Sequence, residues 1–61
     1  MEHKVTEGDI VSFTNRYLRK VIGKCIYVET FNEFNAIVEY DRRGVKEREW
    51  IDIDKLTYIP N

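Results

Sequence analysis

The sequence predicts a small all-β domain of five short strands, with one short helical turn before the last strand. Three observations support this prediction. Apolar and polar residues alternate with a period of two in several short stretches, as in strands that bury one face. Turn-forming residues separate these stretches roughly every ten residues. No stretch of about ten or more residues has the helical period.

Length and composition indicate one domain with a small core. The chain has 61 residues, of which 43% are hydrophobic. Residues 1–7 are polar, and we expect a flexible N-terminal tail there, followed by a single β domain over 8–61. Apolar runs are shorter than a membrane span, and the N-terminus lacks the order of a signal peptide. We therefore expect a cytoplasmic protein with no membrane partner.

The first strand is expected to follow a turn at Gly8 and Asp9. Glycine tolerates a positive φ, and aspartate hydrogen-bonds to nearby backbone. Val11 and Phe13 then share one face of the strand. The next segment, 14–20, holds three basic residues and one tyrosine without a clear period, and we interpret it as a loop.

A second strand is predicted over 21–28. Gly23 inside this apolar run indicates a bulge or a sharp bend. Both faces of the strand carry apolar residues, which is typical of a strand bent enough to serve two sheets. Residues 29–35 carry two Asn and two Glu and are interpreted as a turn, and 36–40 alternate again as a third strand.

A hairpin is predicted in the second half of the chain. Residues 41–44, DRRG, place Asp first and Gly last, which predicts a type I turn with a glycine-assisted bulge. The returning strand, 45–53, is charged in its first half, which we expect to project into solvent as a long arm. A helical turn over 52–55 precedes the last strand, 56–59, which Pro60 ends by removing a backbone donor.

This order of elements resembles a small SH3-like barrel. A closer resemblance rests on Gly8, Asp9, Val11, Phe13, Gly23 and the stretch Asn35-Ala36-Ile37-Val38 ahead of an acidic position. These residues are similar to the pattern of short proteins of Gram-positive bacteria grouped as YkvS-like, and more loosely to KOW and Tudor-type barrels. The resemblance covers about residues 8–40. It implies the barrel fold, and it implies no activity, because the YkvS-like proteins have none established.

Catalysis and metal binding are not expected. A nucleophilic Cys25 would need a histidine beside it, and the one histidine, His3, lies in the expected tail. Cys25 lies in an apolar strand, where a free cysteine is usually a small inert hydrophobe. Asp52 and Asp54 lack the glycine and the third oxygen ligand of a calcium loop. We therefore expect no enzyme, no cofactor and no metal site.

Charge is balanced overall but clustered locally. Ten basic and eleven acidic residues give a formal net charge of −1, which argues against a nonspecific nucleic-acid binder. Cations interleave with one aromatic residue in two segments: Arg16, Tyr17, Arg19 and Lys20 in the loop, and Arg42, Arg43, Lys46 and Arg48 in the hairpin. Stacking combined with phosphate contact uses such residues, although the acidic residues among them weaken the attraction for phosphate.

The sequence favours a non-catalytic interaction module with a groove between the 14–20 loop and the 41–48 hairpin. Tyr17 and Trp50 would supply flat apolar surface. Four arginines would orient the partner through charged hydrogen bonds: Arg16, Arg19, Arg42 and Arg43. The partner would be an acidic or extended protein segment, or a second copy bound through an unpaired edge strand. The alternative is a KOW-like factor that binds RNA or DNA, and the sequence leaves open whether Trp50 is buried or exposed.

Overall fold

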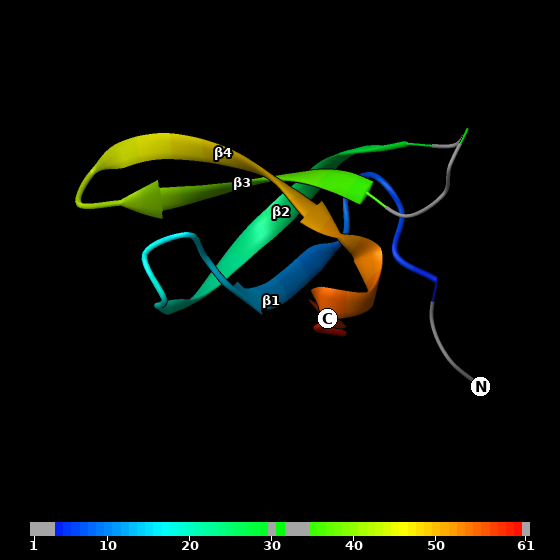
Figure 1. Ribbon diagram of the computed structural model, residues 1–61, viewed down its shortest axis with the longest axis horizontal. Coiled ribbons are helices and arrows are strands. Elements are labelled where there is room, and N and C mark those ends of the chain that lie inside the picture. The colour runs from blue at the N-terminus through cyan, green and yellow to red at the C-terminus, as the bar shows by residue number, and fades with distance from the viewer. Residues whose placement is uncertain (1–3, 30, 32–34, 61) are drawn as a thin grey trace.

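The computed structural model of the chain describes residues 4–29, 31 and 35–60, which form one antiparallel sheet (Figure 1). Its strands are β1 (Ile10–Thr14), β2 (Lys20–Val28), β3 (Asn35–Arg42), β4 (Val45–Asp52) and β5 (Thr57–Tyr58). A 3-10 turn, η1 (Ile53–Lys55), lies between β4 and β5. The predicted all-β class, the five strands and the helical turn before the last strand are confirmed.

The sheet is curved, but it is not closed into a barrel. Its spatial order is β4-β3-β2-β1-β5, so β4 and β5 are its two edges. The long strand β2 joins the two halves, since it pairs with β1 along its first part and with β3 along its second part. Lys24 has a partner on each side, Ile10 and Glu39. The bent second strand agrees with the prediction, and the predicted barrel is not confirmed.

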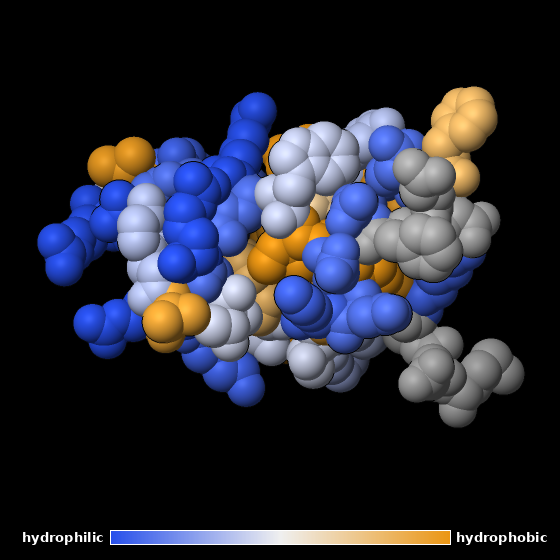
Figure 2. All heavy atoms as spheres, viewed as in Figure 1, coloured by the Kyte–Doolittle hydropathy of each residue, from blue (hydrophilic) through white to orange (hydrophobic). Residues whose placement is uncertain are grey.

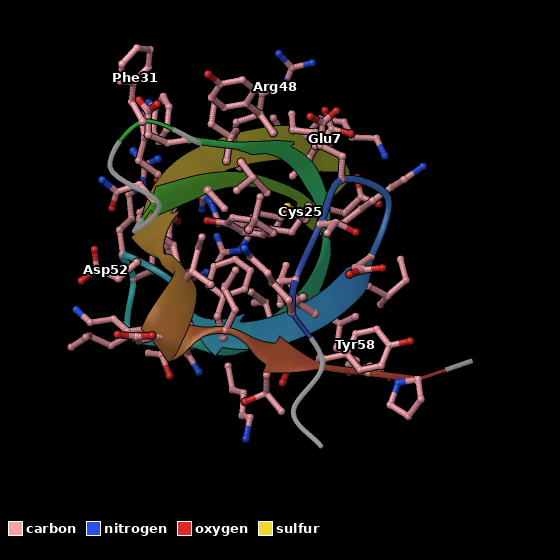
Figure 3. The ribbon with its side chains drawn as sticks, turned by 90° about the vertical axis from the view of Figure 1, so that its right-hand side faces the viewer. Glu7, Cys25, Phe31, Arg48, Asp52 and Tyr58 are labelled. Atoms are coloured by element: carbon pink, nitrogen blue, oxygen red, sulfur yellow. The ribbon has the colours of Figure 1, made fainter. Side chains whose placement is uncertain are left out.

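The core lies on the concave face of the sheet. Phe13 from β1 and Tyr40 from β3 meet edge to face, with ring centroids 5.5 Å apart and ring planes at 79°. Figure 3 shows Cys25 enclosed by the ring of strands. The buried apolar side chains are Val5, Val11, Phe13, Cys25, Ala36, Val38 and Tyr40. The predicted inward faces of the first and third strands are therefore confirmed.

The N-terminal segment contributes to this core. Val5 is only 4% exposed, so the expectation of a flexible tail through residue 7 is wrong at this position. Gly8, at φ 97°, forms the predicted turn, and its N–H donates to the Cys25 carbonyl at 2.7 Å. The sequence could not predict the burial of Val5, because a single valine among polar residues shows no strand or helix periodicity. Elsewhere in the expected tail, residues 4, 6 and 7 are exposed, and residues 1–3 lie outside the described residues.

Gly23 is not the site of the bulge. The register of β2 on β3 shifts between Cys25 and Tyr27 instead. A Cβ atom on Gly23 would lie 2.7 Å from the Glu39 carbonyl oxygen and 2.7 Å from Val38 Cγ1. Glycine is therefore required here because β2 approaches β3 too closely for a side chain.

The turn of the β3–β4 hairpin is tighter than predicted. Arg42 pairs with Val45, which leaves a two-residue loop of Arg43 and Gly44. Both loop residues have positive φ, 54° and 82°, as a type I′ turn requires. The predicted type I turn with a bulge is wrong, because a type I′ turn matches the right-handed twist of the two strands.

The first half of β4 is mostly exposed to solvent, as predicted: of residues 45–48, only Glu47 is partly covered. The second half differs, because Glu49 turns toward the core with a side chain only 7% exposed. Both carboxylates have partners inside the curved sheet. Trp50 lies on the opposite face and is 58% exposed, which answers the question that the sequence left open.

Replacing Arg43 with asparagine is expected to stabilise the fold. Asparagine adopts positive φ more readily than arginine, and Asn-Gly is a preferred type I′ pair. We expect Arg43→Asn to raise the free energy of unfolding by about 0.5–1 kcal/mol in urea titrations. Arg42→Asn, one residue earlier in the strand, is the control and should give no gain. Equal losses in the two variants would contradict the assigned turn.

Candidate binding site

The loop between β1 and β2 is organised by Asn15, which the sequence reasoning missed. The buried Asn15 Oδ1 accepts hydrogen bonds from the N–H groups of Tyr17 and Arg19, both at 2.9 Å. The Leu18 N–H donates to the Asn15 carbonyl, and Leu18 itself has φ 61° and is 85% exposed. An Asn directly after a strand is the signal that could have identified this turn, since its side chain mimics backbone.

This loop and the β3–β4 turn lie at the same end of the molecule (Figure 1). Strongly hydrophilic side chains gather at that end in Figure 2. Between the loop and the turn lies a hollow of about 400 Å³, which we call the loop–turn hollow. It is lined by Asn15, Tyr17, Arg19, Val21, Arg42 and Arg43. The structure thus brings together four of the predicted site residues: Tyr17, Arg19, Arg42 and Arg43.

Arg42 and Tyr17 form one wall of the hollow. The Arg42 guanidinium lies 4.2 Å from the centroid of the Tyr17 ring, which is a cation–π contact. Arg42 Nε also donates to Glu47 Oε2 at 2.7 Å. This hydrogen bond raises the pKa of Arg42 above its ordinary value. Arg42 is therefore occupied within the fold and holds Tyr17 in place.

The Arg16 side chain also has an ion-pair partner within the fold, Glu49. Arg16 Nε lies 3.2 Å from Glu49 Oε2, and the Arg16 N–H donates to the same carboxylate at 3.1 and 3.2 Å. The Tyr40 hydroxyl donates to Glu49 from inside the core. This buried carboxylate, which the sequence reasoning missed, therefore ties the loop to β4. The signal available was its parity with Ile51, which places it on the inward face.

The ionisation of Glu49 follows from these contacts. Burial alone would raise the pKa of Glu49, but hydrogen bonds from Tyr40 and from the Arg16 backbone and guanidinium outweigh it and lower that pKa below 4.5. Burial, together with the hydrogen bond to Glu49, raises the pKa of Tyr40 to about 12. At neutral pH Glu49 is therefore an ionised acceptor and Tyr40 a protonated donor.

Arg19 and Arg43 are the free charges of the loop–turn hollow. Both are exposed, and neither side chain has an ion-pair partner among the residues that the structure describes. They line the hollow from opposite sides, one on the loop and one on the turn. The hollow therefore offers positive charge that the fold itself does not use.

Trp50 does not join this hollow. It lies on the convex face of β4, where its ring meets that of Tyr27 edge to face, with centroids 5.9 Å apart. Both aromatic side chains are exposed. The structure therefore does not bring Tyr17 and Trp50 together in one groove. Successive residues of a strand point to opposite faces, and Trp50 points away from the hollow.

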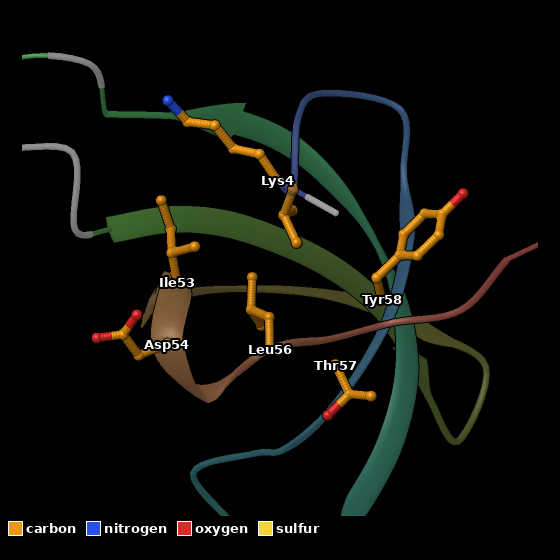
Figure 4. Close-up of a pocket in the computed structure, with 7 residues that line it drawn as sticks. Lys4, Ile53, Asp54, Leu56, Thr57 and Tyr58 are labelled. Carbon is orange, nitrogen blue, oxygen red and sulfur yellow. The ribbon is translucent and has the colours of Figure 1, made fainter. Parts of the chain in front are cut away.

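A second hollow, of about 530 Å³, lies between the N-terminal segment and η1 (Figure 4). Ile53 and Leu56 point into this space, whereas the Lys4 amine, the Asp54 carboxylate and the Tyr58 hydroxyl point away from it. A specific ligand site usually combines an apolar lining with a few convergent polar groups. Among the described lining residues such groups do not converge.

The remaining candidate chemistry is limited in the part of the chain that is described. Cys25 is fully buried, and burial raises the pKa of its thiol. His3, its one candidate base, lies outside the described residues. Elsewhere in 4–29, 31 and 35–60, His, Cys, Asp and Glu do not cluster in a group of three that could hold a metal ion. Within the same residues, the structure has no helix with the length and hydropathy to cross a membrane.

Comparisons with known protein families, with curated proteins and with solved structures found no match for this chain. The resemblance to SH3-like barrels and to YkvS-like proteins therefore stays a prediction. The chemistry of the loop–turn hollow has to be interpreted from its own residues.

Proposed function

We propose that the chain is a non-catalytic, SH3-like interaction module that binds an acidic, extended protein segment in the loop–turn hollow. The SH3-like part of the proposal is supported by the strand order, by β2 shared between two pairings, and by η1 before β5. These are the features for which the sequence resembles such barrels.

The observation that supports binding best is the division of the arginines into two pairs. Arg16 and Arg42 are held by Glu49 and Glu47, whereas Arg19 and Arg43 are exposed and unpaired within the described chain. An arginine fork matches a carboxylate with two parallel hydrogen bonds. The two free arginines face the hollow from opposite walls, so they suit carboxylates that are spaced along an extended segment.

Tyr17 gives this site an apolar surface. Its ring, fixed by Arg42 on one side, is about half exposed. A rigid aromatic side chain loses little conformational freedom when a partner covers it, which is why such residues are frequent in binding sites. A peptide that pairs its carboxylates with Arg19 and Arg43 can cover Tyr17 between them.

Reversing the charge of the two free arginines is expected to abolish most of the binding. The probe is a fluorescein-labelled peptide of alternating glutamate and serine, followed by fluorescence anisotropy. Because hydrogen bonds to charged groups contribute more than neutral ones, Arg19→Glu with Arg43→Glu should weaken binding about tenfold or more. The melting temperature should change little, since neither side chain has a partner in the described fold.

The matched control for net charge is Lys4→Glu with Lys55→Glu, since neither lysine lines the hollow and the pair makes the same change of −4. This control should leave the affinity within about twofold. Equal affinity in the native chain and in the double reversal would contradict the proposal. Labelled single- and double-stranded DNA and RNA serve as competing probes. Tighter binding of these probes than of the peptide, with a steep dependence on salt, would favour the KOW-like alternative.

A further inference from the structure

The edge strand β4 presents a backbone that its own sheet leaves unpaired. It has eight residues, against two in β5, the other edge. Alternate residues of an antiparallel strand direct N–H and C=O to its neighbour. The Arg48 carbonyl accepts a hydrogen bond from Arg16 Nη2 at 2.9 Å, so Arg48 directs its backbone away from β3. Trp50 and Asp52 follow at spacings of two and do the same.

A hollow of about 260 Å³ lies beside this edge, between Trp50, Asp52 and Lys55 and the segment 14–16 at the end of β1. Figure 3 shows Arg48 and Asp52 on the outside of the curved sheet. Unpaired strand edges of this kind are templates for another strand.

The side chains of this edge also form a surface that the core does not use. Arg48, Trp50 and Asp52 share the convex face, because residues two apart in a strand point the same way. Trp50 and Tyr27 together expose an aromatic pair on that face. The partner for such an edge must therefore supply a strand, an apolar contact and complementary charges.

A second copy of the chain supplies all three in one register. Two β4 strands related by a two-fold axis pair antiparallel, with one residue opposite itself. An axis at Glu47 or Glu49 places two glutamates opposite each other, and an axis at Arg48 places two arginines there. Like charges directly opposite each other destabilise a strand pair.

A two-fold axis at Trp50 places neither two glutamates nor two arginines opposite each other. It places Trp50 opposite the partner's Trp50, and Arg48 opposite the partner's Asp52 on both sides of the axis. An axis at Ile51 would lose both of these ion pairs. Arg48 and Asp52 are exposed and equally spaced about Trp50, so the strand carries a charge pattern complementary to its own reverse. Each also has a partner within its own chain, Glu39 at 3.0 Å from Arg48 and Lys55 at 4.0 Å from Asp52, and these exposed pairs would be shared with the second copy.

We propose that two copies of this chain associate through antiparallel pairing of their β4 edges about Trp50. The shared surface combines backbone hydrogen bonds from Trp50 and Asp52, contact between the tryptophan rings, and two Arg48–Asp52 ion pairs. Arg16, which binds the Arg48 carbonyl, borders this surface at one end, and the carbonyl keeps a second lone pair for the partner. The interface is small, so the association is reversible and weaker than that of an obligate dimer.

Cysteine cross-linking tests the register. In a hydrogen-bonded antiparallel pair the Cα atoms lie about 5.5 Å apart, within the range of a disulfide. Trp50→Cys should therefore form a covalent dimer under mild oxidation with copper-phenanthroline. Lys46→Cys, on the same edge and face, is the control, because its two copies would lie about 26 Å apart. The native Cys25 is fully buried.

The expected result is cross-linking of Trp50→Cys at least about tenfold faster than that of Lys46→Cys, which would have to react by random collision. Equal rates would overturn the proposed register. Sedimentation of the native chain tests the association itself. A chain that remains monomeric at about 1 mM would overturn the proposal, because even a weak specific contact is populated there.

Charge reversal provides a second test. Asp52→Arg places arginines opposite each other on both sides of the axis and should weaken the association at least about fivefold. Adding Arg48→Asp restores opposite charges and should recover it to within about twofold of the native chain. Circular dichroism confirms that each variant is folded. Unchanged association in Asp52→Arg, or no recovery in the double variant, would overturn the ion pairs.

Discussion

Replacing Gly23 with alanine is expected to destabilise the protein more than the same replacement at Gly8 or Gly44. The new Cβ would lie 2.7 Å from the Glu39 carbonyl oxygen, 2.7 Å from Val38 Cγ1 and 3.2 Å from Tyr40 Cβ. The Val38 side chain is fully buried, and the Glu39 carbonyl belongs to the strand that pairs with β2. Neither neighbour can move without disturbing the core or the ladder.

We expect Gly23→Ala to lower the free energy of unfolding by about 3 kcal/mol, at the upper end of the usual cost of overpacking. A domain of this size has a total stability of roughly 3–9 kcal/mol, so Gly23→Val should not fold. The measurement is urea unfolding followed by circular dichroism and Trp50 fluorescence.

Gly44→Ala is the matched control, because it adds the same methyl group with nothing within 4 Å. Its cost comes from φ 82° alone and should be about 1–2 kcal/mol. A Gly23→Ala variant as stable as the native chain, or less affected than Gly44→Ala, would contradict the close approach of β2 and β3.

Gly23 also shows where prediction of the fold from sequence ends. The alternation in 10–14 and 36–40 predicts which side chains face inward, because each strand buries one face and the period alone identifies it. A glycine inside a strand has two explanations, freedom of φ or lack of a side chain. Choosing between them requires the neighbouring strand, which the local sequence does not contain.

The candidate site shows the same division. The clustering of arginines in the 14–20 loop and the 41–48 hairpin predicted the loop–turn hollow, because the charge of each segment can be read directly from its own residues. Which arginines remain free depends on which carboxylates the fold brings beside them: Glu47, five residues along the chain, pairs with Arg42, and Glu49, 33 residues away, pairs with Arg16. Trp50 was assigned to the groove by residue type, whereas the pleat of β4 directs it to the other face.

The separation of bound and free arginines makes the hollow a preorganised site. Glu49 fixes the start of the loop through Arg16, and Glu47 fixes Tyr17 through Arg42. Arg19 and Arg43 are thereby presented from a rigid frame, which lowers the ordering cost of binding. Loss of Glu49 should therefore affect folding first and binding as a consequence.

Glu49→Ala is expected to lower the free energy of unfolding by about 3 kcal/mol. The variant leaves the buried Tyr40 hydroxyl without its acceptor, and an unpaired buried polar group is costly. Adding Tyr40→Phe removes that unpaired hydroxyl, so the double variant should be no less stable than Glu49→Ala alone. Glu39→Ala, which removes an exposed pair with Arg48, is the control and should cost less than about 1 kcal/mol. A loss from Glu49→Ala no larger than that of the control would contradict the structural role of this carboxylate.

The same carboxylate should make stability depend on pH. The folded state holds the pKa of Glu49 below the ordinary value of 4.5, so the ionised group stabilises the fold above that value. This stabilisation is lost as the pH falls from about 4.5 through the lowered pKa, because protonation is then favoured in the unfolded chain first. Glu49→Gln keeps an acceptor for Tyr40 but cannot ionise. The difference in unfolding free energy between the native chain and Glu49→Gln, measured in urea from pH 7 to pH 3, should therefore shrink below about pH 4.5. A difference that stays constant over this range would show that the charge of Glu49 contributes nothing, and that its hydrogen bonds alone hold the loop to β4.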